Sequence, residues 1–309
     1  MSRAQLPVVI AGQTCAGKSS LALSLADALS GALVCADSRQ VYDGLRIASA
    51  GPDDAERARA PHHLFGVVDP RTVYDAGRFV DDADRAIEEI AAGGRRAILV
   101  GGTGMYLRAW RHGLDDVPAG DPTVRRALDD EIAREGLARV HARLAVVDPE
   151  SAARISPHDR VRVVRALEVF ALTGSPASAL RVSHGARVAR REALWILVEG
   201  EVAWLAKRIA ARATAMFAAG LVDEARALRA RLGADHALTE TLGVREALAV
   251  VDGRASVDDA IAETALRTRQ YARRQRKWFA REDGWTRLDA RAPDLVARAL
   301  DLVARADAA

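Results

Sequence analysis

The fold is decided by the run from Pro7 to Ser19, which reads Pro-Val-Val-Ile-Ala-Gly-Gln-Thr-Cys-Ala-Gly-Lys-Ser. Its second part matches the P-loop pattern G-x-x-x-x-G-K-[ST], directly after an apolar strand and before a helix that starts at Ser20. The backbone N–H groups of such a loop surround a phosphate, while Lys18 supplies a positive charge and the Ser19 hydroxyl can bind Mg²⁺. The run therefore predicts a diphosphate or nucleotide site formed by Gly12, Gln13, Thr14, Cys15, Ala16, Gly17, Lys18 and Ser19.

Short apolar runs elsewhere predict further buried strands, at 32–35, 64–68, 97–100 and 194–198, in addition to the strand at 7–11. Helical patterns such as that at 79–90 lie between them, and this alternation is typical of a parallel α/β sheet. The alternation stops near residue 114, and apolar residues then keep helical spacing. We predict a P-loop NTPase-like α/β core of parallel sheet and flanking helices at 1–114 and 189–309, with an all-helical insertion domain at 115–188. A long basic helix near 256–282 and an amphipathic helix near 293–307 complete the prediction.

The composition excludes several classes of protein. Half of the 309 residues are hydrophobic, which excludes a disordered chain. The longest uncharged stretch has fourteen residues, fewer than the roughly 18 that a membrane-spanning helix needs. Two cysteines cannot form a disulfide framework, and no Cys/His spacing indicates a zinc site. We expect a cytoplasmic monomer that does not associate with a membrane.

Basic residues are concentrated in two runs, although the net charge is only +3. Residues 160–191 contain seven arginines and one acid, Glu168, and residues 267–281 contain six arginines, Lys277 and no acid. A single run of this kind is often a solvated helix face. Two runs favour a polyanionic partner.

The P-loop by itself leaves kinases, NTPases and other transferases as alternatives. A hydrolase would usually have an acid at the end of a later strand, but the strand at 97–100 is followed by Gly101-Gly102-Thr103-Gly104. The carboxylate is instead Asp37, after the strand at 32–35. Parallel strands open onto the same edge of a sheet, so Asp37 can face the ligand of the loop. The alternative is that Asp37 only stabilises a turn or caps a helix.

Taken together, the P-loop and six blocks of sequence after it resemble the tRNA dimethylallyltransferases. The resemblance covers nearly the whole chain. After the P-loop the blocks are Asp37 to Tyr42, His62-His63-Leu64 with Val68-Asp69-Pro70, Gly101 to Tyr106, Arg165 to Val169, Met216 with Gly220-Leu221, and Thr268 to Gln275 with Trp278-Phe279. The resemblance implies transfer of a dimethylallyl group from dimethylallyl diphosphate to N6 of adenosine 37 in the tRNA anticodon loop. It implies Mg²⁺ as the cofactor and no consumption of ATP, although P-loops of this kind are also typical of ATP-binding proteins.

The resemblance also implies roles for individual residues. Asp37 is expected to be the base that takes the proton from the adenine amine, and Thr103 to place a hydroxyl beside the reacting centre. Arg208 and Arg212, one helical turn apart, are expected to hold the diphosphate. The residues expected to contact the tRNA are Asp37, Ser38, Arg39, Gln40, Thr103, Arg125, Arg160, Arg162, Arg165, Arg269, Arg273 and Arg274.

The chain departs from the family pattern at a few positions. Ser49-Ala50-Gly51-Pro52 stands where the family has Thr-Ala-Lys-Pro, so Gly51 replaces a lysine. Gly243-Val244-Arg245-Glu246 stands for Gly-Tyr-Lys-Glu. His62 and His63 match the family, and we expect buried or hydrogen-bonding side chains rather than metal ligands.

Three other functions remain open at this point. An adenylate prenyltransferase that makes free cytokinin would use the same chemistry but needs no basic surface for RNA. A small-molecule kinase would consume ATP, with residues 160–191 as its arginine-rich lid. A non-catalytic RNA-binding switch protein would use the P-loop only to sense nucleotides.

Overall fold

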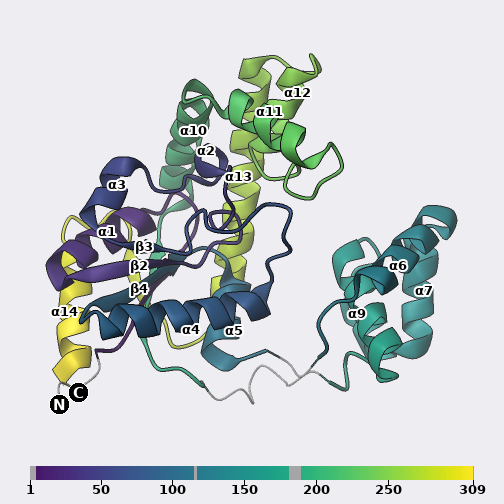
Figure 1. The fold of residues 1–309 in the computed structure, drawn as a ribbon, viewed down its shortest axis with the longest axis horizontal. Helices are drawn as coiled ribbons and strands as arrows, with labels where there is room; N and C mark the ends of the chain where they lie inside the picture. Colours follow the sequence, from purple (N-terminus) through teal and green to yellow (C-terminus); the bar gives the residue numbers. More distant parts are fainter. Residues whose placement is uncertain (1–4, 115–116, 181–188, 309) are drawn as a thin grey trace. The chain divides into compact units, whose positions relative to one another are not determined.

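The structure, a computed structural model, describes residues 5–114, 117–180 and 189–308. The chain forms two compact units. The first consists of the parts up to Arg111 and from Arg190 onward, and the second of residues 112–189. Figure 1 shows a sheet covered by helices in the first unit and a group of helices in the second.

The first unit is built on a six-stranded sheet in which every neighbouring pair is parallel. The strand order is β3-β2-β4-β1-β5-β6. The strands are β1 (Val8–Gly12), β2 (Gly31–Cys35), β3 (His62–His63), β4 (Arg96–Gly101), β5 (Leu194–Glu199) and β6 (Thr286–Asp289). The predicted parallel α/β core is confirmed. Because β4 lies between β1 and β2, the segments after these three strands meet at one edge of the sheet.

Helices cover both faces of the sheet (Figure 1), and successive side chains of a strand point to opposite faces. Val8 and Ile10 share a core with α1 (Lys18–Leu29) and α14 (Leu295–Ala308). Val9 and Ala11 share another with α4 (Ala76–Ala92) and α5 (Gly104–His112). A strand buried on both faces has apolar side chains at every position, which is why these strands appear as continuous apolar runs in the sequence.

Four of the five predicted strands are confirmed within one residue at each end, and the fifth is wrong. The structure pairs His62–His63 with β2, whereas 64–68 forms no strand and contributes only a bridge between Tyr42 and Val68. The backbone turns there, because Leu64 and Gly66 have φ values of 64° and 66°. Strand β6 was not predicted from the sequence, because only Leu288 in it is buried.

The described part of the first unit has six further helices. They are α2 (Arg46–Ser49), α3 (Asp54–Arg59), α10 (Val202–Ala218), α11 (Leu221–Leu232), α12 (Val244–Val251) and α13 (Val257–Phe279). The helices expected near 256–282 and 293–307 are α13 and α14. Helices α10 and α13 pack along each other, and α11 and α12 form a separate apolar core with α2.

In the second unit, all regular structure between residues 117 and 180 is helical. It consists of α6 (Pro122–Glu135), α7 (Leu137–Val147), α8 (Pro149–Arg154) and α9 (Arg160–Thr173), around a core that includes Val140, Leu144 and Val163. The fully buried Asp148 accepts hydrogen bonds from Ser151 N and from the Ser178 hydroxyl, which hold its pKa at about 2 against the effect of burial. The segments next to the predicted boundaries, 115–116 and 181–188, lie outside the described residues.

Candidate active site

The P-loop joins β1 to α1 by a turn that depends on glycine at its two ends. Gly12 has φ +147°, and a Cβ there would lie 2.1 Å from the carbonyl oxygen of Val198 on the neighbouring strand. Gly17 has φ +88° at the start of α1. Cys15 between them also adopts a positive φ, 63°, which is uncommon outside glycine. The first backbone N–H groups of α1 have no partner within the helix, so they are available to an anion in the loop.

Lys18 is folded into this loop, where its Nζ donates a hydrogen bond to the carbonyl oxygen of Gln13 at 2.7 Å. The pKa of Lys18 is lowered to about 8, chiefly by burial; the neighbouring Arg212 also lowers it, whereas the carboxylate of Asp37 acts in the opposite direction. The ammonium group of Lys18 is therefore only partly hydrated. A bound diphosphate would supply the missing negative charge.

Asp37 follows β2, and backbone N–H groups shortly after it in the chain orient its side chain. Its Oδ1 accepts hydrogen bonds from the N–H groups of Arg39, at 2.8 Å, and of Gln40, at 3.4 Å. Thr103, on the turn after β4, accepts a hydrogen bond from Ser38 N at 3.0 Å and donates one to the Ser38 hydroxyl at 3.4 Å. The turns after β2 and β4 are thus joined beside the carboxylate.

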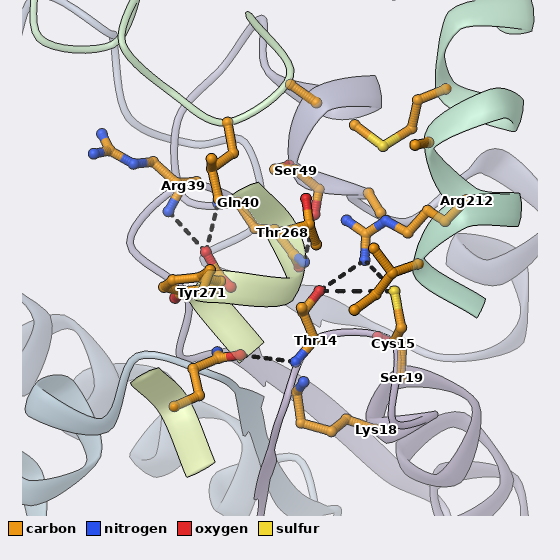
Figure 2. A pocket seen from close by; sticks show the side chains of 18 of the residues that line it. Thr14, Cys15, Lys18, Ser19, Arg39, Gln40, Ser49, Arg212, Thr268 and Tyr271 are labelled. Carbon is orange, nitrogen blue, oxygen red and sulfur yellow. Dashed lines mark hydrogen bonds between the residues drawn. The ribbon is translucent and has the colours of Figure 1, made fainter. Parts of the chain in front are cut away.

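The P-loop and Asp37 line the same pocket, which has a volume of about 850 Å³. Figure 2 shows side chains from several distant segments pointing into it. Its walls come from the loop and the start of α1, from residues 37–40 and 48–50, from α10, from α13 and from residues 240–242. The volume lies in the range typical of small-molecule sites, about 300 to 1,000 Å³.

The two arginines predicted on the helix after β5 contact the P-loop directly. Arg208 Nε donates a hydrogen bond to the carbonyl oxygen of Cys15 at 2.8 Å. Arg212 Nη1 donates to the Thr14 hydroxyl at 3.2 Å (Figure 2). Both residues line the pocket, so α10 brings two guanidinium groups to the phosphate loop.

One face of α13 forms a wall of the pocket, and Arg274 is the one residue predicted for the site from its sequence that lines it. Thr264, Thr268, Tyr271 and Gln275 recur at helical spacing and all line the pocket. Burial raises the pKa of Tyr271, and the Asp37 carboxylate raises it further, so the phenol remains protonated at neutral pH. The repeat at every third or fourth position was a readable signal of one helix face, but the sequence did not show what that face would meet.

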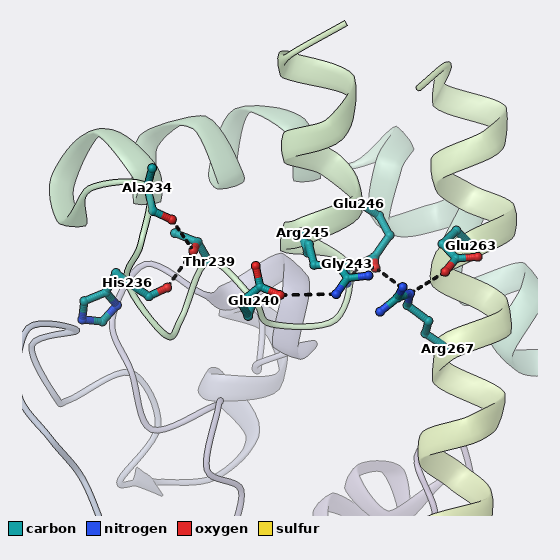
Figure 3. Close-up of polar contacts among 9 residues, drawn as sticks. All are labelled: Ala234, His236, Thr239, Glu240, Gly243, Arg245, Glu246, Glu263 and Arg267. Carbon is teal, nitrogen blue, oxygen red and sulfur yellow. Dashed lines mark hydrogen bonds and ion pairs between the residues drawn. The ribbon is translucent and has the colours of Figure 1, made fainter. Parts of the chain in front are cut away.

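The basic residues of α13 lie in different environments. Arg274 lines the pocket, with its guanidinium 5.7 Å from the centre of the Tyr271 ring, whereas Arg269 and Arg273 are exposed and do not line it. Arg267 instead pairs with Glu263 and with the buried Glu246, as Figure 3 shows.

Glu246 also accepts a hydrogen bond from Gly243 N at 2.8 Å. The cluster in Figure 3 therefore links α13 to the segment before α12. This segment contains the pocket residues 240–242.

The predicted arginines of the helical unit are all engaged in ion pairs. Arg125 and Arg165 both pair with Glu168, whose side chain is fully buried and also accepts a hydrogen bond from Asp121 N. Arg160 pairs with Asp129 and Arg162 with Asp159, and all four of these side chains are at least one-third exposed. Arg181 and Arg187 of the same run lie outside the described residues.

His62 lies in a hydrogen-bonding environment. His62 Nδ1 lies 2.8 Å from the carbonyl oxygen of Ala60, and the ring stands edge-on to Phe65 at 5.1 Å, as expected for a hydrogen-bonding histidine. Among the described residues, no three His, Cys, Asp or Glu side chains are grouped so that they could hold a metal ion.

This chain is similar to known proteins over most of its length. The family model described as IPP transferase matches residues 40–282. A tRNA dimethylallyltransferase of Anaeromyxobacter dehalogenans is 48% identical over 267 residues, which cover 86% of this chain and 89% of that protein. A tRNA dimethylallyltransferase of Geobacter metallireducens is 46% identical over 275 residues, covering 86% of this chain and 87% of the relative.

Solved structures show the same fold. The tRNA isopentenylpyrophosphate transferase from Bacillus halodurans aligns with a TM-score of 0.70 and 31% identity, over 98% of this chain and 96% of that one. A eukaryotic dimethylallyltransferase acting on tRNA aligns with a TM-score of 0.74 and 26% identity, over 96% of this chain and 77% of that one. On the agreement of the family model, the relatives and the fold, this chain belongs to the IPP transferase family.

Proposed function

We propose that this protein transfers a dimethylallyl group from dimethylallyl diphosphate to N6 of adenosine 37 in the anticodon loop of tRNA. The observation that carries the proposal is the shared pocket, in which a P-loop and an oriented carboxylate, Asp37, line one space of about 850 Å³. A P-loop holds the leaving group of this reaction, and a carboxylate can take the proton that the amine loses.

The donor is held through its diphosphate. The loop N–H groups, Lys18, Arg208 and Arg212 surround the position at which negative charge accumulates as the allylic C–O bond breaks. Because Lys18 and the arginines are already in place before the donor binds, little reorganisation is needed when the bond breaks.

The residues of the loop also fit Mg²⁺. The exposed Ser19 side chain lines the pocket, and protein-bound Mg²⁺ usually has one or two protein ligands, with the remaining positions filled by substrate phosphates and water. We propose that Ser19 holds the ion against the diphosphate. Bound there, Mg²⁺ would neutralise part of the charge of the leaving group.

The acceptor is placed on the other side of the pocket. An adenine must leave its stack before its N6 can meet the allyl carbon, and an anticodon loop allows this at low cost. Asp37 accepts the amine proton, the Thr103 hydroxyl lies beside the reacting centre, and Ser38, Arg39 and Gln40 contact the edges of the nucleotide. The relatives' names, tRNA dimethylallyltransferase, support this acceptor.

The helical unit and the exposed face of α13 contact the tRNA backbone in this proposal. The side chains of Arg160 and Arg162 are 56% and 66% exposed, and their ion pairs are of the weak surface kind, so these arginines can exchange their partners for phosphates. Arg269 and Arg273 are exposed and extend the basic surface on α13. Arg125 and Arg165 are held by buried Glu168, and we assign them a smaller share of the binding.

Among the described residues, no helix is both long enough and apolar enough to cross a membrane. We propose that the protein acts in the cytoplasm, where tRNA is modified, and that it acts as a monomer.

The test is incubation of unmodified tRNA with dimethylallyl diphosphate and Mg²⁺, followed by mass analysis of nucleoside 37. Parallel reactions with AMP as acceptor, and with ATP as phosphoryl donor, separate the adenylate prenyltransferase and the kinase. A gain of one dimethylallyl group on adenosine 37 supports the proposal. Transfer to AMP in preference to tRNA, or phosphoryl transfer without alkylation, refutes it.

A further inference from the structure

Gln275 on α13 joins the two sides of the active site through its side-chain amide. Its Oε1 accepts a hydrogen bond from Thr14 N in the P-loop at 2.8 Å, and its Nε2 donates one to the carbonyl oxygen of Gly102 at 2.9 Å. The residue is 6% exposed. It is separated by 261 residues from Thr14 and by 173 from Gly102, so only the tertiary structure creates this link.

The chemistry of the two partners determines how the amide must lie. A backbone N–H requires an acceptor and a backbone C=O requires a donor, so the side chain at this position must present one of each. The space is matched to the same side chain, because a Cβ on Gly102 would lie 2.3 Å from Gln275 Nε2. We call these two hydrogen bonds the Gln275 bridge.

The bridge continues toward the carboxylate. Thr103 follows Gly102 in the chain, its hydroxyl accepts a hydrogen bond from Ser38 N, and Ser38 follows Asp37. A continuous path of backbone and hydrogen bonds therefore runs from the loop that holds the diphosphate, through Gln275, to the residue that faces the amine.

We infer that Gln275 is a positioning residue, which sets the spacing between the phosphate loop and the turn bearing Thr103, and through Ser38 the spacing to Asp37. This inference rests on the proposed function. Alkylation requires the allyl carbon and N6 to approach to about 3 to 3.5 Å, and a displacement of 1 Å can reduce the rate about 100-fold. Gln275 lines the pocket, but both polar atoms of its side-chain amide are bonded to the protein, to Thr14 N and to the Gly102 carbonyl oxygen. Because the amide is engaged in this way, we expect its effect to fall on kcat more than on the affinity for either substrate.

The decisive variant is Gln275→Glu, which keeps the shape and changes only the donor. An ionised carboxylate still accepts from Thr14 N but cannot donate to the Gly102 carbonyl, whereas a protonated carboxyl can do both. Gln275→Leu removes both hydrogen bonds at every pH. Gln5→Glu, at an exposed position before the start of β1 and so at the opposite end of that strand from the P-loop, is the matched control for added charge.

The experiment measures kcat and KM for tRNA prenylation from pH 6 to 9, with each variant divided by the wild type at the same pH. We expect the kcat ratio of Gln275→Glu to be about 10- to 100-fold below unity wherever the introduced carboxylate is ionised. The kcat ratio of Gln275→Leu stays low throughout, and that of Gln5→Glu stays near unity. Thermal melting of each variant at both pH limits shows whether the loss follows unfolding instead.

Several results would overturn the inference. A kcat ratio of Gln275→Glu or Gln275→Leu that stays near unity at every pH, or a loss confined to KM, excludes a positioning role. So does a loss that parallels melting of the variant at the assay temperature.

A double-mutant comparison tests the path itself. In a Thr103→Ala background, Gln275→Leu should reduce kcat by a smaller factor than in the wild type, and fully multiplicative losses contradict the path. An inactive wild-type enzyme overturns the proposed function together with this inference, whereas an active wild type with an unaffected Gln275→Leu variant overturns the inference alone.

Discussion

Lys18 makes the strength of diphosphate binding depend on pH in a predictable direction. Its pKa is lowered from 10.5 to about 8, chiefly because burial in the P-loop disfavours the ammonium. At about 1.4 kcal/mol per pKa unit, keeping this charge in the unliganded loop costs on the order of 3 kcal/mol. A bound diphosphate reverses much of this cost, so the pKa of Lys18 rises again in the complex.

The sign of the effect follows from proton linkage. Above pH 8 the unliganded enzyme has lost the Lys18 proton, and binding must restore it. The Kd for dimethylallyl diphosphate should therefore be flat from pH 7 to 8 and rise by up to about tenfold per unit above pH 8. The ligand's own last ionisation, near pH 6 as for a phosphate monoester, does not interfere in this window.

Stability of the unliganded protein should change in the opposite sense. The folded-state pKa lies below the unfolded value, so between about pH 8 and 10.5 the unfolded chain binds more protons, and stability rises with pH. Lys18→Met should accordingly stabilise the unliganded protein at pH 7 by up to about 3 kcal/mol while weakening diphosphate binding. Lys207→Met, at an exposed position on α10, is the control and should do neither.

Isothermal titration calorimetry at pH 7, 8 and 9, in two buffers of different ionisation enthalpy, measures both the Kd and the protons taken up. Chemical denaturation at pH 7 and pH 10 measures the stability. If Lys18→Met and the wild type show the same rise of Kd above pH 8, or if binding takes up no proton at pH 9, the reasoning is wrong.

Three further predictions concern the other polar groups. Asp37→Asn should lower kcat about 10²- to 10⁴-fold in tRNA prenylation assays, with the Kd for dimethylallyl diphosphate in calorimetry changed less than about threefold. Arg212→Ala should weaken diphosphate binding about 10- to 100-fold by calorimetry, because it removes charge-assisted hydrogen bonds to phosphate oxygens; an unchanged Kd excludes it from the donor site. Arg162→Gln should reduce the steepness of the slope of log K for tRNA binding against log salt concentration by about one. Arg165→Gln should instead lower the melting temperature of the helical unit, because the buried Glu168 loses a partner. Equal effects of the two substitutions on both measurements would contradict this division.

The family signal in the sequence was strong because its blocks are local. A strand, a glycine loop and a helix start are defined by neighbouring residues, so Gly12 to Ser19 could be interpreted before any contact was known. The continuous apolar runs of β1, β2, β4 and β5 were equally readable, since a strand buried on both faces needs apolar side chains throughout. Strands β3 and β6 were not readable, because a two-residue strand and a strand with one buried residue carry almost no pattern.

The fate of the basic residues could not be predicted from their positions along the chain. Arg165 and Arg162 belong to one run, but one is held by a buried carboxylate and the other lies at the surface. Similarly, Arg274 lines the pocket, while Arg267 on the same helix forms ion pairs with Glu246 and Glu263. Charge is a property of composition, whereas the partner of a charge depends on which helices pack together.

The sequence by itself determined the α/β class, the phosphate loop and the family, because each rests on residues that are close in the chain and whose local geometry is dictated by their type. Only the tertiary structure decided what faces that loop. It brought Asp37 from β2, Arg208 and Arg212 from α10 and Gln275 from α13 to one edge of the sheet. The physical reason is that a hydrogen bond between residues 261 positions apart is specified by the packing of whole helices and strands, which no local pattern encodes.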